Sequence, residues 1–182
     1  MRALAARCAR SVDLVVVGQP EKLDGSDLDS DLFVGAVLGG GRPCLMVPRW
    51  VRPHNWGKRA LIAWKGSPEA ARAVQGALPL LKSAEAVRIC VSNPRGEYEG
   101  EDEASLSRLS TYLLRHGVRV EETVVRQSWE GAARMFVSEI EGFGADLLVM
   151  GAYGRPRAQE IIFGGMTEDM MREARIPILF AH

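Results

Sequence analysis

Short apolar runs alternate with amphipathic stretches from about residue 58 to the end of the sequence. Residues 59–64 form one such run, which Gly66 ends, and a run of that length is typical of a buried strand. Ser67 and Pro68 then mark a helix start, because Ser is a good N-cap and Pro fits the first helical position. The alternation recurs to the C-terminus and predicts strands at 59–64, 87–91, 118–125, 146–151 and 176–180.

The alternation of strands and helices decides the predicted architecture. Strands linked in this way need crossover connections, so the sheet should be largely parallel. We predict an α/β fold with an open, mostly parallel five-stranded sheet, helices on both faces and strand order 3-2-1-4-5. Residues 118–125 alternate apolar and polar side chains, as an edge strand does, whereas residues 146–151 are the most apolar and are expected at the centre.

The first fifty residues contain a repeat of the last strands. Residues 13–18 (DLVVVG) match residues 146–151 (DLLVMG) in pattern, and residues 42–47 match residues 177–180 at a nearly equal separation. The alternative explanation is chance similarity between apolar strands.

The repeat predicts how the chain is divided. Residues 1–48 would be the C-terminal remnant of a truncated first copy, residues 49–58 a linker, and residues 59–182 a complete domain. Two strands and a helix bury too little surface to fold alone. The remnant must therefore pack on the complete domain or on another chain.

Composition narrows the class of protein. The chain has 23 Lys and Arg against 23 Asp and Glu, so no net field draws it to nucleic acid or to an anionic membrane. No apolar run approaches the roughly 20 residues of a membrane span, and no signal peptide pattern is present, so we expect a cytoplasmic protein. Cys8, Cys44 and Cys90 are widely separated, as are the three His, and predict neither a disulfide framework nor a metal site.

A glycine motif follows the strand at 146–151. Gly151 and Gly154 come first, and Gly164 and Gly165 precede a helix that Thr167 is expected to cap. Glycine lets the backbone approach a ligand closely, and a helix N-terminus offers N–H groups to a phosphate. The crevice of such a sheet lies at the ends of the first and fourth strands. Turn glycines without a ligand are the alternative explanation.

Several motifs together resemble the universal stress protein family over residues 57–182. They are IAWKGS at the first strand, DLLVMGAYG at the fourth, the Gly-x2-Gly-x9-Gly spacing and the final IPIL. The preceding remnant resembles the tandem, two-domain bacterial members. The resemblance implies a Rossmann-like fold of the adenine nucleotide alpha hydrolase type and, in nucleotide-binding members, ATP with Mg²⁺. Carried over by position, the nucleotide-binding candidates are Ala63, Lys65, Val91, Met150, Gly151, Gly154, Arg155, Gly164, Gly165, Met166 and Thr167.

Two residues depart from the family pattern. Lys65 stands where an acidic residue typically contacts the adenosine part, and an ammonium group has no acceptor for hydroxyl protons. Gly165 stands where a hydroxyl residue is expected, which removes a phosphate contact. Lys65 can still act as a point charge for phosphate.

Three functions remain open on the sequence. The first is a non-enzymatic stress-response module with a crevice for a small ligand, and the second is an interaction module without nucleotide. The third, a slow ATP hydrolase, lacks a G-x4-G-K-[ST] loop or GxSxG elbow, and Glu160 is its one plausible base.

Association is expected along the last strand. Family members pair through it across a twofold axis, so residues 43–47 should lie beside residues 178–180 within one chain. The apolar surface left on the remnant would favour a homodimer. The predicted interface residues are Pro43, Leu45, Val47, Ile178 and Phe180.

Overall fold

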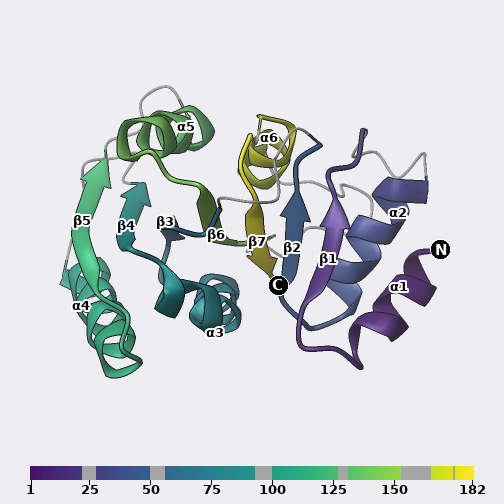
Figure 1. Cartoon of the computed structure of the whole chain (residues 1–182), viewed down its shortest axis with the longest axis horizontal. Helices are drawn as coiled ribbons and strands as arrows, with labels where there is room; N and C mark the ends of the chain where they lie inside the picture. Colours follow the sequence, from purple (N-terminus) through teal and green to yellow (C-terminus); the bar gives the residue numbers. More distant parts are fainter. Residues whose placement is uncertain (22–27, 50–55, 93–99, 127–130, 153–164, 174) are drawn as a thin grey trace.

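The computed structural model describes residues 1–21, 28–49, 56–92, 100–126, 131–152, 165–173 and 175–182 (Figure 1). These residues form one seven-stranded sheet in the order β1-β2-β7-β6-β3-β4-β5. The strands are β1 (Val15–Gly18), β2 (Cys44–Val47), β3 (Arg59–Trp64), β4 (Ala86–Ser92), β5 (Val120–Arg126), β6 (Leu147–Gly151) and β7 (Ile178–Ala181). The helices are α1 (Arg2–Ala9), α2 (Leu28–Val34), the π-helical η1 (Gly35–Gly39), α3 (Pro68–Ser83), α4 (Gly100–Arg115), α5 (Ala132–Phe143) and α6 (Gly165–Glu173).

The strand count corrects the prediction of a five-stranded sheet. All neighbouring strands are parallel except β2 and β7, which are antiparallel. The apolar outer edge of β7 accepts β2, and β1 then pairs with β2, so the N-terminal segment adds two strands to the sheet. The order β5-β4-β3-β6-β7 over residues 59–182 is therefore one part of a longer sheet, with β6 at its centre.

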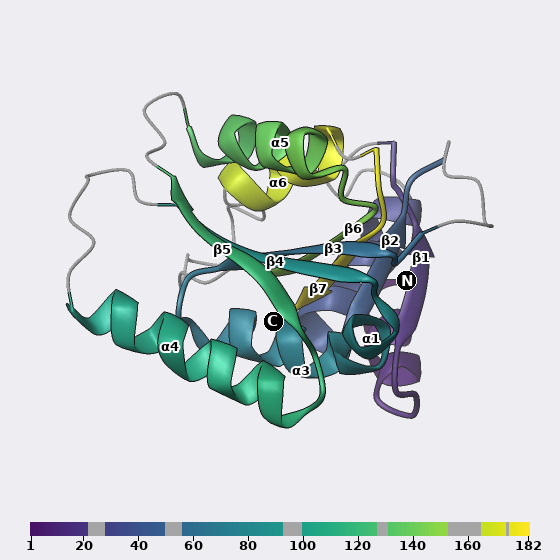
Figure 2. The same cartoon turned by 60° about the vertical axis from the view of Figure 1, so that its left-hand side comes forward.

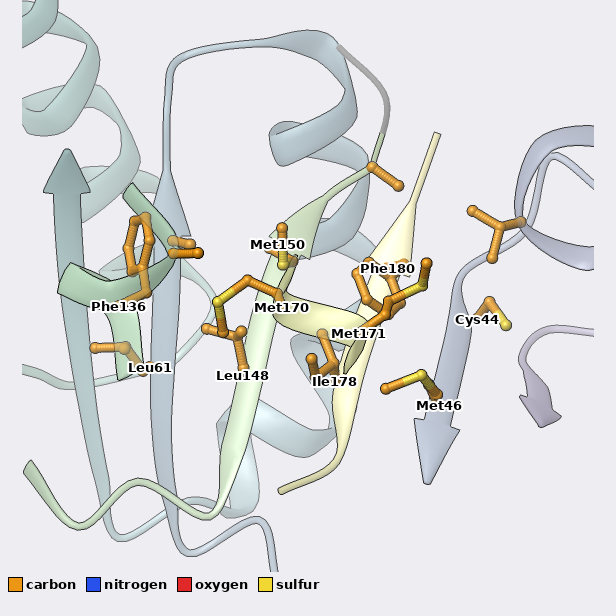
Figure 3. Packing of buried hydrophobic residues seen from close by; sticks show 14 of the residues in the cluster. Cys44, Met46, Leu61, Phe136, Leu148, Met150, Met170, Met171, Ile178 and Phe180 are labelled. Atoms are coloured by element: carbon orange, nitrogen blue, oxygen red, sulfur yellow. The ribbon is translucent and has the colours of Figure 1, made fainter. Parts of the chain in front are cut away.

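Helices cover both faces of the sheet. Figure 2 shows α3 and α4 on one face and α5 and α6 on the other. The larger buried cluster lies on the α5 and α6 side and is rich in sulfur, with Met46, Met150, Met170 and Met171 close to Phe180 (Figure 3). A second cluster fills the α3 and α4 side. Each face of the central strands is therefore buried, which explains why their sequences are apolar throughout rather than alternating.

Helix α3 follows its sequence signals closely. The Ser67 hydroxyl accepts a hydrogen bond from the Ala70 N–H at 3.3 Å, Pro68 begins the helix, and Glu69 lies in its first turn. The apolar face is fully buried against the sheet, with Ala73 and Ala77 at 0% exposure. The small side chains bring the helix axis close to β6 and β7.

The N-terminal helices pack closely through glycine. A Cβ on Gly35 would lie 2.3 Å from the Arg2 carbonyl oxygen, and one on Gly39 would lie 2.6 Å from the Ala6 Cβ. Helix α1 therefore rests directly on the α2–η1 backbone. Phe33 of α2 reaches the core and meets Phe180 of β7 edge to face, with ring centroids 5.9 Å apart. The N-terminal segment thus shares its core with the rest of the chain.

Within the described parts of the chain, no helix combines the length and the apolar character that crossing a membrane requires.

Candidate functional site

The predicted crevice lies at the carboxyl ends of β3 and β6. Ala63 and Met150 are register partners there, and both side chains are buried. On the other side of β3, Val91 of β4 is the register partner of Trp64. The strand order reverses between β3 and β6: β4 and β5 follow on the β3 side, whereas β7 follows on the β6 side. A parallel sheet opens a ligand crevice at such a point. The structure thus brings Ala63 and Met150 together on one face. Val91, as the register partner of Trp64, ends β4 at the same edge of the sheet but faces the α4 side.

Gly151, the last residue of β6, packs directly against the first turn of α3. A Cβ at this position would lie 2.6 Å from the Ala70 nitrogen and 2.8 Å from the Glu69 carbonyl carbon. These are backbone atoms of a capped helix end and cannot move independently. The sequence assigned Gly151 to ligand approach, but in the structure the glycine is first required by helix packing.

Lys65 follows β3 and is exposed. The next residue, Gly66, has a positive φ of 69°, and a Cβ on it would lie 2.9 Å from the Ser105 hydroxyl oxygen of α4. The Trp64 indole N–H donates to the same hydroxyl at 3.2 Å. Trp64 is therefore held against α4, on the sheet face opposite to Ala63 and Met150. Lys65 follows it and presents an exposed ammonium group at this end of β3.

Two charged or titratable groups at the crevice were not predicted from the sequence. Partial burial raises the pKa of Glu69, but hydrogen bonds from its own backbone N–H and from the Ser67 hydroxyl, with the charges of Arg72 and His182, lower the pKa overall. His182 places its Nδ1 3.1 Å from the Ala152 carbonyl oxygen at the end of β6. The acidic first turn of α3 was the available signal for Glu69, whereas His182 is brought here only by the tertiary fold.

The glycine loop is described only at its two ends. Gly154, Arg155 and Gly164 lie outside the described residues, as does Glu160. Helix α6 begins at Gly165, so the expectation that Thr167 caps it is wrong, because Thr167 is already inside the first turn. Thr167 is 6% exposed, and Met166 packs against the core on the α5 and α6 side.

The predicted interface residues lie at the junction of β2 and β7. Leu45 pairs with Leu179, Cys44 with Phe180, and Met46 with Ile178, so the expected contact within one chain is present. Pro43 packs on Gly76 of α3, where a Cβ would come within 2.6 Å of the Pro43 ring. Val47 ends β2 and is half-buried.

Metal ligands do not gather anywhere in the described residues: no three His, Cys, Asp or Glu side chains lie close enough to hold an ion. Of the cysteines, Cys8 is exposed, whereas Cys44 and Cys90 are buried, and burial raises the pKa of the Cys44 thiol to about 12.

Solved structures of similar fold include universal stress proteins. A protein from Archaeoglobus fulgidus DSM 4304 matches 96% of this chain and 62% of its own length, with TM-score 0.73 and 17% identity. One from Pseudomonas aeruginosa UCBPP-PA14 matches 98% and 67%, with TM-score 0.65 and 18% identity. The chain therefore spans less than two thirds of the archaeal relative.

A shorter relative, a universal stress protein in complex with cAMP, matches 69% of this chain and 96% of its own length, with TM-score 0.54 and 20% identity. At these identities the likeness concerns the fold alone. None of the curated proteins matches the sequence. The universal stress protein family profile, however, matches residues 57–182, which is well over half of the 182 residues. The chain belongs to the universal stress protein family.

Proposed function

We propose that the chain is a non-enzymatic stress-response module that binds an adenine nucleotide at the ends of β3 and β6. The observation that carries the proposal is the pairing of Ala63 with Met150 beside Gly151, at the point where the strand order reverses. A universal stress protein of the same fold has been solved with cAMP, which supports a nucleotide as the ligand class.

Different described residues would contact the base and the phosphates of the nucleotide. Ala63 and Met150 are buried side by side on one face of the sheet and give an apolar wall for the base. Val91 ends the neighbouring strand at the same edge of the sheet. The start of α6 at Gly165 offers backbone N–H groups to phosphate. Glu168 would oppose an anion there, but its carboxylate is bound by Arg172 at 2.6 Å, which offsets part of its charge. Mg²⁺ would arrive with the phosphates rather than on a protein cluster.

Lys65 takes the place of the family's acidic residue and sets the expected preference. Its ammonium group favours phosphate over ribose hydroxyls, because it donates hydrogen bonds and cannot accept them. We therefore expect ATP to bind more tightly than adenosine.

Calorimetric titration with ATP and Mg²⁺ tests the proposal. We expect saturable heat with a dissociation constant at or below about 1 mM and a raised melting temperature. Lys65→Gln should weaken ATP more than adenosine, whereas Lys82→Gln, at an exposed lysine in the last turn of α3, should change neither. Absence of heat at millimolar ATP, with an unchanged melting temperature, would remove nucleotide binding.

Turnover is measured separately with labelled ATP. A binding module releases no phosphate above the buffer rate. Release that disappeared on Glu160→Gln would instead support the slow ATP hydrolase.

We also propose that residues 1–48 are equivalent to the last part of the complete domain. Two backbone hydrogen bonds recur: Val15 N–H to the Pro43 carbonyl at 3.0 Å matches Leu148 N–H to the Pro177 carbonyl at 3.0 Å. Likewise Gln19 N–H to the Val47 carbonyl, at 3.0 Å, matches Ala152 N–H to the Ala181 carbonyl, at 2.8 Å. Equivalent residues Leu45 and Leu179 pair with each other at the centre of the β2–β7 ladder, which places a local twofold axis between them.

The second candidate function is association without nucleotide. Met1, Leu4, Leu28 and Leu38 are apolar side chains between 36% and 58% exposed on or beside α1, α2 and η1, and a second chain that covered them would give a homodimer. Sedimentation velocity tests it: a dimer is expected, and Leu4→Glu should dissociate it. A monomer at all concentrations would contradict the dimer and leave the nucleotide proposal untouched.

A further inference from the structure

Strand β1 occupies, in the N-terminal segment, the place that β6 occupies in the complete domain. β6 has β7 on one side and β3 on the other, both parallel to it. β1 has the parallel strand β2 on one side, and no strand pairs with its other edge within the described residues. Figure 1 shows β1 as the outermost strand of the sheet, next to α2. A bare edge presents a row of backbone donors and acceptors to a further strand.

Val16 shows that a covering layer is missing from one face of β1. Its equivalent in β6 is Val149, which is 0% exposed in the cluster beneath α3. Val16 itself is 61% exposed. An apolar side chain is thus placed where β6 carries one that a helix buries.

Gly18 and its equivalent Gly151 give a sharper contrast. At Gly151 a Cβ would lie 2.6 Å from the Ala70 nitrogen, so glycine is required by the start of α3. At Gly18 a Cβ would meet no atom within 4 Å, and nothing in the described residues requires glycine there. The space beside Gly18 thus corresponds to the one that the start of α3 fills beside Gly151, and no described helix fills it.

Asp13 is the third equivalent position. Its counterpart Asp146 accepts hydrogen bonds from the backbone N–H groups of Gly57, Lys58 and Arg59 at 3.0, 3.1 and 2.8 Å, and so fixes the entry of β3. Asp13 is exposed, and no hydrogen bond or ion pair to it is found among the described residues. Its carboxylate is complementary in charge to the amides of an entering strand.

We propose that the outer edge of β1 binds a parallel β-strand followed by a helix, a unit like residues 57–83 of this chain, supplied by another polypeptide. The site is continuous with the β1–β2–β7 pairing, and β-strand addition to a sheet edge is a common recognition mode. The strand pairs with β1, its entry amides bind Asp13, and the helix start packs on Gly18 and covers Val16. Two β1 edges paired with each other would bring no helix to Gly18 and Val16. The inference rests on the repeat proposed above and is independent of nucleotide binding.

The test uses the whole chain and a synthetic peptide of residues 57–83 with a fluorophore at its C-terminus. We expect saturable one-to-one binding by anisotropy, and slower hydrogen exchange at the amides of β1 but not of β6. Gly18→Ala should weaken binding by at least about tenfold, because its Cβ meets the helix start. Asp13→Asn should weaken it by a smaller factor, since an amide oxygen is a poorer acceptor than a carboxylate.

Two controls distinguish specific binding from the effect of any added Cβ and from unspecific binding of the peptide. Gly142→Ala adds a Cβ at another glycine with no atom within 4 Å, away from β1, and should leave binding unchanged. A peptide carrying Leu61→Asp should not bind, because this side chain is fully buried in β3. Both glycine variants should unfold at or above the wild-type urea midpoint, which shows that they fold.

The proposal is overturned if the peptide does not bind at its solubility limit, or if it binds equally to the chain with Gly18→Ala. Self-association of the chain that Gly18→Ala abolishes in the absence of peptide would assign this edge to a second copy instead.

Discussion

Alanine at two equivalent glycines should have opposite consequences for stability. In Gly151→Ala the new Cβ would lie 2.6 Å from the Ala70 nitrogen, whereas ordinary contact begins at 3.4 Å. The start of α3 must therefore retreat from β6 by roughly 0.8 Å, the difference of those two distances. Overpacking of this kind costs about 1–3 kcal/mol.

The equivalent change Gly18→Ala meets open space and should cost nothing. Alanine also restricts the unfolded chain and adds about 0.4–1 kcal/mol of stability at either site, so the difference between the two variants is the informative quantity.

Urea unfolding followed by circular dichroism measures that difference. With a slope of about 2 kcal/mol per molar, a difference of about 1–3 kcal/mol in the free energy of unfolding separates the two midpoints by roughly 0.5–1.5 M, with Gly151→Ala the lower. Equal midpoints would refute the assignment of Gly151 to helix packing. If Gly18→Ala lowered the free energy of unfolding as much as Gly151→Ala, the conclusion that the face of β1 at Gly18 is uncovered would be refuted.

Three further predictions concern the core, the thiols and pH. A double-mutant cycle with Phe33→Leu and Phe180→Leu should give a coupling of about 0.5–1.5 kcal/mol in urea unfolding, and a zero coupling would separate the N-terminal segment from the shared core. Ellman's reagent should label Cys8 alone in the native state, because Cys44 is buried with a pKa raised to about 12; rapid labelling of Cys44 would contradict its burial. The pKa of Glu69 is lowered below its ordinary 4.5. The ionised carboxylate therefore stabilises the fold above that pH, and this stabilisation is lost as the pH falls through the folded pKa. Glu69→Gln should therefore reduce the difference between the free energies of unfolding at about pH 7 and about pH 3. An unchanged difference would show that the Glu69 carboxylate does not stabilise the fold.

The elements of residues 59–182 could be predicted because each has a local signal. The strand at 59–64 was found to the residue, since an apolar run ends there at a glycine with positive φ. The helix after it carries its own cap at Ser67. Boundaries without such a signal were displaced, as at α6, which begins at Gly165 rather than after Thr167.

The seven-stranded sheet could not be counted from the sequence alone. Pairing of β2 with β7 joins Leu45 to Leu179 across 134 positions, and no local pattern fixes the side on which such strands add. The sequence did indicate that residues 43–47 lie beside residues 178–180, because both strands are apolar and the repeat relates them.

The candidate site was predicted by position and only partly by chemistry. Ala63 and Met150 meet because adjacent parallel strands end together, which the strand order implies. The contacts of Glu69 and His182 depend on how α3 seats on the sheet and could not be foreseen. The role of Gly151 in packing was hidden for the same reason, since the motif alone suggests a ligand.

The most direct test of nucleotide binding at this crevice is a titration of the ¹⁵N-labelled chain with ATP and Mg²⁺, followed by amide chemical shifts. The account predicts saturable shifts concentrated at Ala63, Lys65, Val91, Gly151 and Thr167, with the amides of β1 unchanged. Shifts confined to other elements, or none at millimolar ATP, would contradict it.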